Sequence, residues 1–93
     1  MLATWSVRTY NFILRYNMEV ETQEQAISAG DLVIEGKIRN AGLKCAIELY
    51  RAGGLGVYQI EKKLNHRKSH EAIANECNYL DRYVFHYDMR GLD

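Results

Sequence analysis

The sequence predicts an α+β domain, with an N-terminal β-strand or hairpin followed by three to four helices packed as a small bundle. Two patterns predict this class. Apolar and polar side chains alternate from Tyr10 to Val20, as in a half-buried strand. From residue 22 onward, apolar side chains recur every three or four residues, as on the buried face of a helix. A chain of 93 residues supports one core. We therefore expect a single domain over 1–93, with a strand region at 1–21 and a helical region at 22–93.

The predicted strand needs a partner, because an isolated strand leaves backbone N–H and C=O groups unsatisfied. A hairpin that turns near Asn17 satisfies this need within one chain. Pairing with the same strand of a second subunit satisfies it between chains. We expect a homodimer, which would also bury apolar area that so short a chain leaves exposed.

Thr22 is placed to cap the first predicted helix, with Gln25 as its reciprocal partner three residues later. The apolar stripe of this helix continues to Gly42, where a glycine favours a helix end. Gly30 and Asp31 lower the helix propensity of its middle. The sequence therefore predicts a bend at that point, or a split into two helices.

Three more helices are expected. Residues 43–52 repeat the helical pattern up to a Gly-Gly pair, and residues 57–64 form a short helix with one apolar face. A turn at 65–68 leads to Ser69, which is placed to cap the last helix. The apolar stripe of the last helix consists of Ile73, Cys77, Leu80, Val84 and Tyr87.

Charge is unevenly distributed along the chain, although the formal net charge is zero. Residues 37–70 carry a net charge of +6, whereas residues 19–36 carry −5 and residues 71–93 carry −3. A basic centre between acidic flanks is typical of an anion-binding surface when the fold gathers the charges on one side. If the fold spreads them around several helices, the basic run is a solvated turn of a small helical bundle.

Residues 46–64 resemble the first two helices of the tri-helical helix-turn-helix found in many transposases and bacterial regulators. The matching residues are Leu49 and Tyr50 in the first helix, Gly54 and Leu55 in the connection, and Ile60 and Leu64 in the second helix. The resemblance extends over 46–77 when Ile73 is aligned with the apolar anchor of the third helix, which requires two extra residues in the turn. Three residues depart from the pattern: Asn65 stands where Gly is usual, His66 where an apolar residue is usual, and Glu61 where a small residue is usual.

The resemblance implies a small non-enzymatic DNA-binding regulatory protein whose third helix begins with the recognition residues. Arg and Asn at such positions can make bidentate contacts with guanine and adenine edges. The residues at the start of this helix are Arg67, Lys68, Ser69, His70 and Asn75, and the residues expected to contact phosphates are Lys44, Arg51, Lys62 and Lys63. The expected partner is duplex DNA or another anionic partner.

A second hypothesis comes from Tyr79, Tyr83 and Tyr87, which are four residues apart and share one face of the last helix. Aromatic side chains of this kind are favoured anchors of protein interfaces. They indicate a small inhibitor or adaptor that masks a host protein, for example one from a nucleic-acid-handling machine. The rings could instead pack against the chain's own strand.

No sequence pattern indicates catalysis, a cofactor or a metal. His66 and His70 are four residues apart, and Cys45 and Cys77 form no Cys-x-x-Cys motif, so neither pair fits a common zinc ligand set. No Ser, Cys or His lies in a recognisable nucleophile motif. We therefore expect no enzyme. Because no apolar run approaches the roughly 20 residues of a membrane span, and no signal peptide is evident, we expect a cytoplasmic location and no membrane partner.

Overall fold

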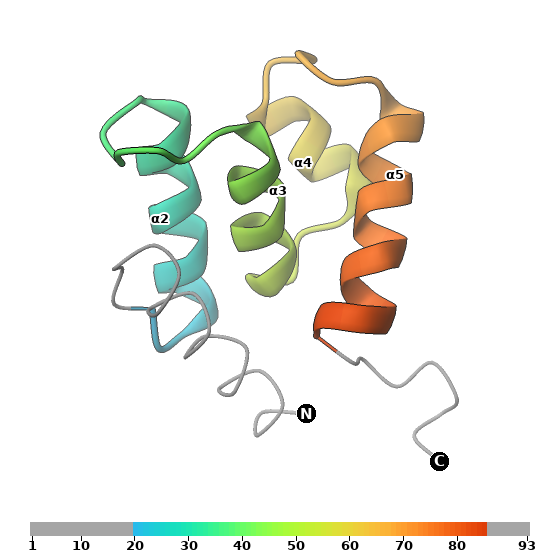
Figure 1. Ribbon diagram of the computed structural model, residues 1–93, viewed down its shortest axis with the longest axis horizontal. Coiled ribbons are helices and arrows are strands. Elements are labelled where there is room, and N and C mark those ends of the chain that lie inside the picture. Colours follow the sequence, from blue (N-terminus) through green and yellow to red (C-terminus); the bar gives the residue numbers. More distant parts are fainter. Residues whose placement is uncertain (1–19, 86–93) are drawn as a thin grey trace.

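The computed structural model describes residues 20–85 of the chain. Their elements are α2 (Gln23–Ile34), α3 (Leu43–Ala52), α4 (Val57–Lys63), α5 (His70–Tyr79) and the π-helix η1 (Leu80–Val84) (Figure 1). Because η1 continues directly from α5, the two form one helical rod. The helices run alternately up and down, so that the α2–α3 and α4–α5 connections lie at one end of the bundle.

The predicted α+β class is wrong, because residues 20–85 consist of helices and connections and contain no strand. The expected strand over 10–20 lies outside the described residues except for Val20, which is buried and has no strand conformation. The hairpin or subunit pairing based on that strand lies outside them too. Within the described residues, the helices bury their apolar faces against one another, so this core needs no sheet.

The start of α2 is the capping box that the sequence predicts. Thr22 Oγ1 accepts a hydrogen bond from the Gln25 N–H at 3.1 Å, and the Gln25 side chain accepts from the Thr22 N–H at 3.1 Å. The predicted continuation to Gly42 is wrong, because α2 ends at Ile34. The chain then turns through Gly36 at φ +79°, a left-handed conformation that favours glycine.

The predicted bend at Gly30 is also wrong, because Gly30 lies within the regular helix α2. A Cβ at this position would come within 2.7 Å of Tyr50 Cε1 and 2.9 Å of Tyr50 Cδ1. The glycine therefore allows the ring of α3 to lie directly against the α2 backbone. Its low helix propensity, about 1 kcal/mol below that of alanine, is offset by this close packing.

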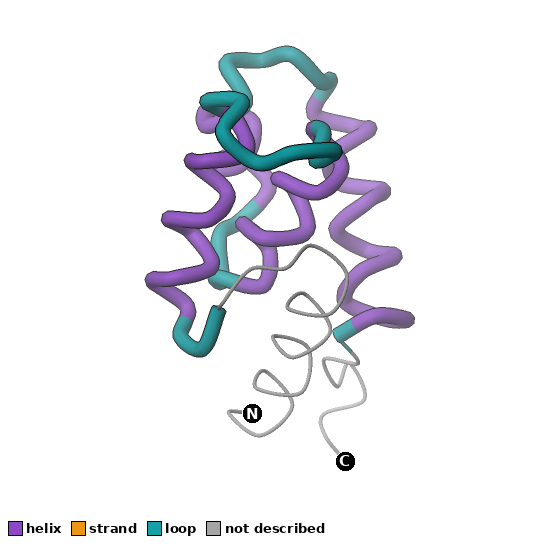
Figure 2. The backbone as a smooth tube through the Cα atoms, turned by 60° about the vertical axis from the view of Figure 1, so that its left-hand side comes forward, coloured by secondary structure: helices purple, strands orange, loops and turns teal. Residues whose placement is uncertain are grey.

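Helix α3 lies at the centre of the bundle, between α2 on one side and α4 and α5 on the other (Figure 2). Seven of its ten residues are buried. They are Cys45, Ala46, Ile47, Glu48, Leu49, Tyr50 and Ala52. Such a helix contacts neighbours on almost every side, which is why its charged residues other than Glu48 lie near its two ends.

The short helix α4 and the rod formed by α5 and η1 cover the second side of α3. Ile60 and Leu64 of the α4 region and Ile73 of α5 are fully buried, and Ser69 caps α5 as predicted. The last turn widens into a π-helix, in which the Phe85 N–H donates to Leu80 O. This wider turn brings Phe85 into the core, whereas Val84, which the α-helical spacing predicts to be buried, stays only partly buried.

We expect Gly30→Ala to destabilise the fold by about 1–3 kcal/mol, the usual range for overpacking a core. The added methyl would clash with the Tyr50 ring, which is buried and so has little room to shift. Thermal and chemical unfolding followed by circular dichroism would measure the change. Ser28→Ala, at an exposed position of the same helix, is the control and should change stability by no more than about 0.5 kcal/mol. A Gly30→Ala protein that is more stable than wild type would contradict the close packing.

Candidate functional site

The described residues gather most of their Lys and Arg side chains at one end of the bundle. Residues 35–42 connect α2 to α3, residues 64–69 connect α4 to α5, and both views place these connections, with the helix ends that flank them, at the same end (Figures 1 and 2). An ion pair of 3.3 Å between Lys63 Nζ and Asp31 Oδ1 joins the end of α4 to the last turn of α2. We call residues 35–44 and 61–71 together the basic end.

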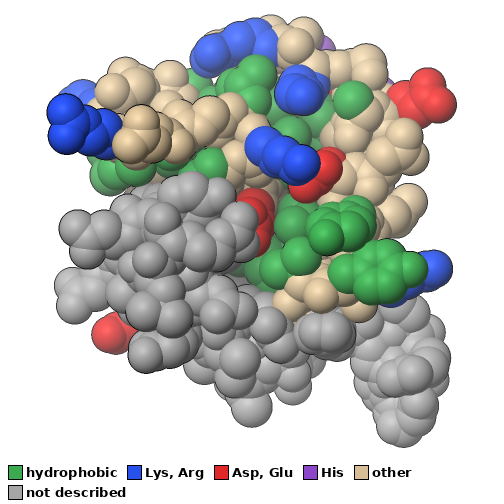
Figure 3. All heavy atoms as spheres, viewed as in Figure 1, with side chains coloured by type: hydrophobic (Ala, Val, Ile, Leu, Met, Phe, Trp, Pro, Cys, Tyr) green, Lys and Arg blue, Asp and Glu red, His purple; other side chains and the backbone are tan. Residues whose placement is uncertain are grey.

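The basic end carries seven Lys or Arg against three Glu, whereas the other described residues carry two Lys or Arg against six Asp or Glu. Most of the Lys and Arg side chains on the face in Figure 3 lie in its upper half, toward this end. The uneven charge along the sequence thus becomes an uneven charge in space. A surface of this kind attracts anions over distances of about a Debye length, roughly 8–10 Å at moderate salt.

Five of the basic residues named from the sequence lie at the basic end and are exposed. They are Lys44, Lys62, Lys63, Arg67 and Lys68. Lys37 and Arg39, in the connection between α2 and α3, are exposed there as well. Both contribute to the net charge of 37–70, but neither was among the site residues predicted from the sequence.

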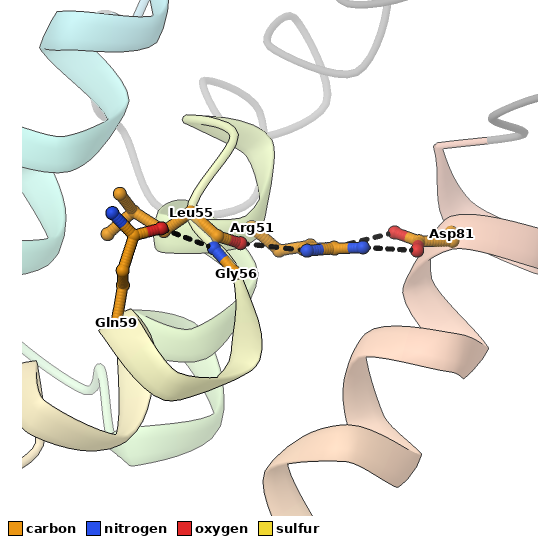
Figure 4. Close-up of polar contacts among 5 residues, drawn as sticks. All are labelled: Arg51, Leu55, Gly56, Gln59 and Asp81. Atoms are coloured by element: carbon orange, nitrogen blue, oxygen red, sulfur yellow. Dashed lines mark hydrogen bonds and ion pairs between the residues drawn. The ribbon is translucent and has the colours of Figure 1, made fainter.

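Arg51 lies near the opposite end of α3 and faces η1 (Figure 4). Its Nε and Nη2 donate hydrogen bonds of 2.9 and 2.7 Å to the two carboxylate oxygens of Asp81, and its Nη1 donates one of 2.8 Å to Leu55 O. The side chains of the pair are only 25% and 12% exposed, so breaking it would cost more than breaking a surface ion pair. The guanidinium of Arg51 therefore fastens α3 to η1 and lies outside the basic end.

Asp31 holds Lys63 close to α2. Its Oδ1 accepts a hydrogen bond of 2.6 Å from the Tyr50 hydroxyl as well as the Lys63 ammonium, and that ammonium lies 5.7 Å from the centroid of the Tyr50 ring. Burial and the hydrogen bond to Asp31 raise the pKa of Tyr50 well above its ordinary value, so the hydroxyl stays protonated and keeps donating. The carboxylate of Asp31 therefore partly neutralises the charge of Lys63, whose side chain remains partly exposed.

The start of α5 presents several polar side chains to solvent at the basic end. Ser69 Oγ accepts a hydrogen bond of 3.1 Å from the Ala72 N–H, which makes Ser69 the helix cap. His70 and Asn75 are exposed, and so is the acidic Glu71 in the first turn. The residues expected at the start of a recognition helix are thus all exposed, beside the carboxylate of Glu71.

Glu61 links α4, the turn and α5. Its two carboxylate oxygens lie 3.1 Å from His66 Nδ1 and 3.1 Å from His70 Nδ1. Its backbone carbonyl accepts the His66 N–H at 3.0 Å. Asn65 and His66 adopt left-handed backbone conformations, with φ of 55° and 59°, which Asn and His tolerate better than most residues. The hydrogen bonds from His70 and then His66 lower the pKa of Glu61.

Three tyrosines were expected on one face of the last helix, and the described residues include two of them. Tyr79 and Tyr83 are 53% and 61% exposed, and their ring centroids are 5.4 Å apart. Tyr87 lies outside the described residues. Tyr58 on α4 is even more exposed, at 74%, and no spacing pattern in the sequence identified it.

Among residues 20–85, no group of three or more His, Cys, Asp or Glu side chains is arranged to hold a metal ion. Cys45 and Cys77 are buried, and burial raises the pKa of the Cys77 thiol. A raised pKa leaves less thiolate, which is the reactive form. Neither observation points to a metal centre or a cysteine nucleophile within this part of the chain.

A comparison of the chain with protein-family models, curated proteins and solved structures gives no match. No helix within residues 20–85 combines the length and the apolar character that crossing a membrane requires.

We expect the stability of the fold to depend on pH through Glu61. Because its pKa in the folded chain lies below the usual value of 4.5, the carboxylate stabilises the fold above about pH 4.5, and this contribution disappears as pH falls from there through the folded pKa. Thermal unfolding from pH 7 to pH 3 should show a smaller loss of stability below pH 4.5 for Glu61→Gln than for wild type. Asn75→Ala, an exposed neutral position on α5, is the control and should keep the wild-type slope. Equal slopes for wild type and Glu61→Gln would rule out the effect.

Proposed function

We propose that this chain is a small non-enzymatic DNA-binding regulatory protein that contacts the phosphate backbone through its basic end. The observation that carries the proposal is the accumulation of seven Lys or Arg at that end, against three Glu. Lys and Arg side chains supply most of the sequence-independent affinity for nucleic acid, because they displace counterions from the phosphates. The acidic remainder of the described residues would repel DNA, which restricts binding to one orientation.

Four basic residues form the centre of the proposed phosphate contact. Lys62 and Lys63 end α4, and Arg67 and Lys68 lie in the turn that follows. All four are exposed, and Lys63 forms an ion pair of 3.3 Å with Asp31. Arg51 is left out of the proposed interface because its guanidinium is bound to Asp81 and Leu55.

The order of α3, α4 and α5 supports duplex DNA as the ligand, since it matches the helix order of the resemblance found in the sequence. The connection between α4 and α5 spans residues 64–69, which is longer than the three to four residues usual in this motif. The left-handed Asn65 allows the turn that a glycine would otherwise provide. His70 and Asn75 on the exposed side of α5 would be the residues nearest the bases, where Asn can pair with adenine.

We also propose a cytoplasmic location, as expected from the sequence. A buried thiol such as that of Cys77 persists in a reducing compartment, where disulfides are rare. The homodimer stays a prediction from the sequence.

The decisive test is a salt series of binding to random duplex DNA, measured by fluorescence anisotropy. Wild type should bind at low salt, and its affinity should fall steeply as salt rises. The quadruple variant Lys62→Ala/Lys63→Ala/Arg67→Ala/Lys68→Ala should bind at least about 100-fold more weakly, and its plot of log Kobs against log salt should be flatter by about 3–4 units, because each lost phosphate contact removes about 0.9.

Arg82→Ala provides a matched control, because Arg82 is an exposed basic residue on η1, away from the basic end. It removes one positive charge from the chain but none from the proposed interface, and should leave the salt slope unchanged within about one unit. Circular dichroism must show that all variants fold. Absence of wild-type binding at low salt would end the proposal, as would a quadruple variant that binds as well as wild type.

The exposed tyrosine pair favours a second function, that of an inhibitor or adaptor that masks a protein partner. Tyr79 and Tyr83 are both more than half exposed, and their ring centroids lie 5.4 Å apart. Exposed aromatic rings of this kind are frequent energetic centres of protein interfaces. In the sequence from Tyr79 to Tyr83, Arg82 is the only Lys or Arg. This surface therefore lacks the concentration of positive charge found at the basic end.

For this second function, we expect a stable complex with a host protein, recovered from lysate by the tagged chain and identified by mass spectrometry. The complex should lose at least about 30-fold in affinity in Tyr79→Ala/Tyr83→Ala, since truncating hot-spot residues, among which Tyr is enriched, costs about 2 kcal/mol or more. The quadruple basic variant is the control and should retain the complex. A partner that binds both variants equally well would not use the tyrosine pair.

A further inference from the structure

Tyr58 is the most exposed large hydrophobic side chain of the described residues, at 74%. It lies in the first turn of α4, and its ring centroid is 4.5 Å from that of His70, with an angle of 40° between the ring planes. Leaving an aromatic ring this exposed forfeits the free energy that burying it would release. A role in binding would account for such a position.

His70 supports the Tyr58 ring from one side and is itself held in place. Its Nδ1 lies 3.1 Å from Glu61 Oε1, and its backbone begins α5 directly after the Ser69 cap. Tyr58 and Glu61 are three residues apart on α4, so ring and carboxylate lie on neighbouring positions of one helix face. One side of the tyrosine ring is therefore fixed against the protein, which reduces the entropy that a ligand would have to remove on binding.

The Tyr58–His70 pair borders the basic end, because His70 belongs to it and Lys62 follows Tyr58 by four residues on the same helix. An aromatic ring next to Lys and Arg side chains matches the composition of sites that bind single-stranded nucleic acid, in which bases stack on rings and cations hold the backbone. The other exposed pair, Tyr79 and Tyr83, lies in the acidic remainder of the described residues, so charge complementarity favours Tyr58 for this role.

We propose that the Tyr58 ring, backed by His70, stacks on an unpaired nucleobase of a strand whose phosphates contact the basic end. This inference rests on the proposed nucleic-acid binding and deepens it, since it names the form of the ligand as DNA in which unpaired bases adjoin the contacted backbone. A regular duplex keeps its bases stacked inside and offers this ring only sugars and groove edges. The favoured ligand is therefore a duplex that carries a single-stranded flank.

The test compares three fluorescent DNA probes that share one duplex. One is blunt, one carries an overhang of about six deoxyadenosines, and one carries an abasic overhang of equal length. The overhang length lies within the site sizes usual for proteins that bind single strands. The abasic overhang supplies the same phosphates without the bases. We expect wild type to bind the adenine overhang about 5- to 150-fold more tightly than the abasic one, which corresponds to about 1–3 kcal/mol for one stacked base.

Tyr58→Ala should abolish the preference for adenine over abasic overhangs while changing affinity for the blunt duplex less than about threefold. Tyr58→Phe keeps the ring and should retain the preference, and Tyr79→Ala should retain it as the control at another exposed tyrosine. Thermal unfolding shows whether the variants fold, and Tyr58→Phe keeps the test informative if Tyr58→Ala does not. If wild type binds none of the probes, nucleic-acid binding itself fails. If it binds all three equally, or if Tyr58→Ala keeps the preference, only the stacking role fails.

Discussion

The constraint on which the rest of the structure depends is the burial of α3 between α2 and the pair α4 and α5. A helix with seven of ten residues buried must find apolar partners on most of its circumference, and three separate helices supply them. One of these contacts needs a glycine, since the Tyr50 ring lies against the backbone of Gly30. Because the faces of α3 are occupied, its exposed or ion-paired cations, Lys44 and Arg51, lie near the ends, where they have different roles.

The up-and-down course of the helices then converts an uneven charge pattern into a two-ended molecule. Two chain segments that are separated by almost all of α3 and α4 return to the same end, and both are rich in Lys and Arg. At that end the charges stay in solvent, where their mutual repulsion is screened. Away from it, Arg51 is bound to Asp81 between α3 and η1, so this cation stabilises the packing of the two helices.

The turn between α4 and α5 combines stability with the proposed ligand surface. Glu61 binds both His66 and His70, and His70 in turn lies against Tyr58. A single carboxylate thus holds a turn in left-handed backbone conformations and supports the aromatic ring that borders the basic end. It also reduces the positive charge there. A protein that needed only maximal charge for phosphates would gain from losing Glu61, so its presence indicates that the shape of this turn matters as well.

The sequence by itself determined the features that arise from neighbouring residues. The capping box at Thr22 and the cap at Ser69 depend on side chains that bond backbone groups three residues away. Apolar spacing and flanking glycines predicted helices over 43–52 and 57–64, and the structure has them at 43–52 and 57–63. The charge of 37–70 was also visible. Five of the six Lys and Arg residues named from it lie at the basic end, although a one-dimensional charge count contains no information on which residues meet.

Only the tertiary structure decided the features that depend on distant partners. Arg51 is bound by Asp81, thirty residues later, and Gly30 remains helical because a ring from α3 packs on it. The expected α+β class is wrong for the described residues, because their helices bury their apolar faces against one another and form a core without a strand. The contact of the Tyr58 ring with His70, twelve residues along the chain, could not be predicted from the sequence. Local hydrogen bonds fix where helices begin, whereas burial and long-range pairing fix which side chains remain available to a ligand.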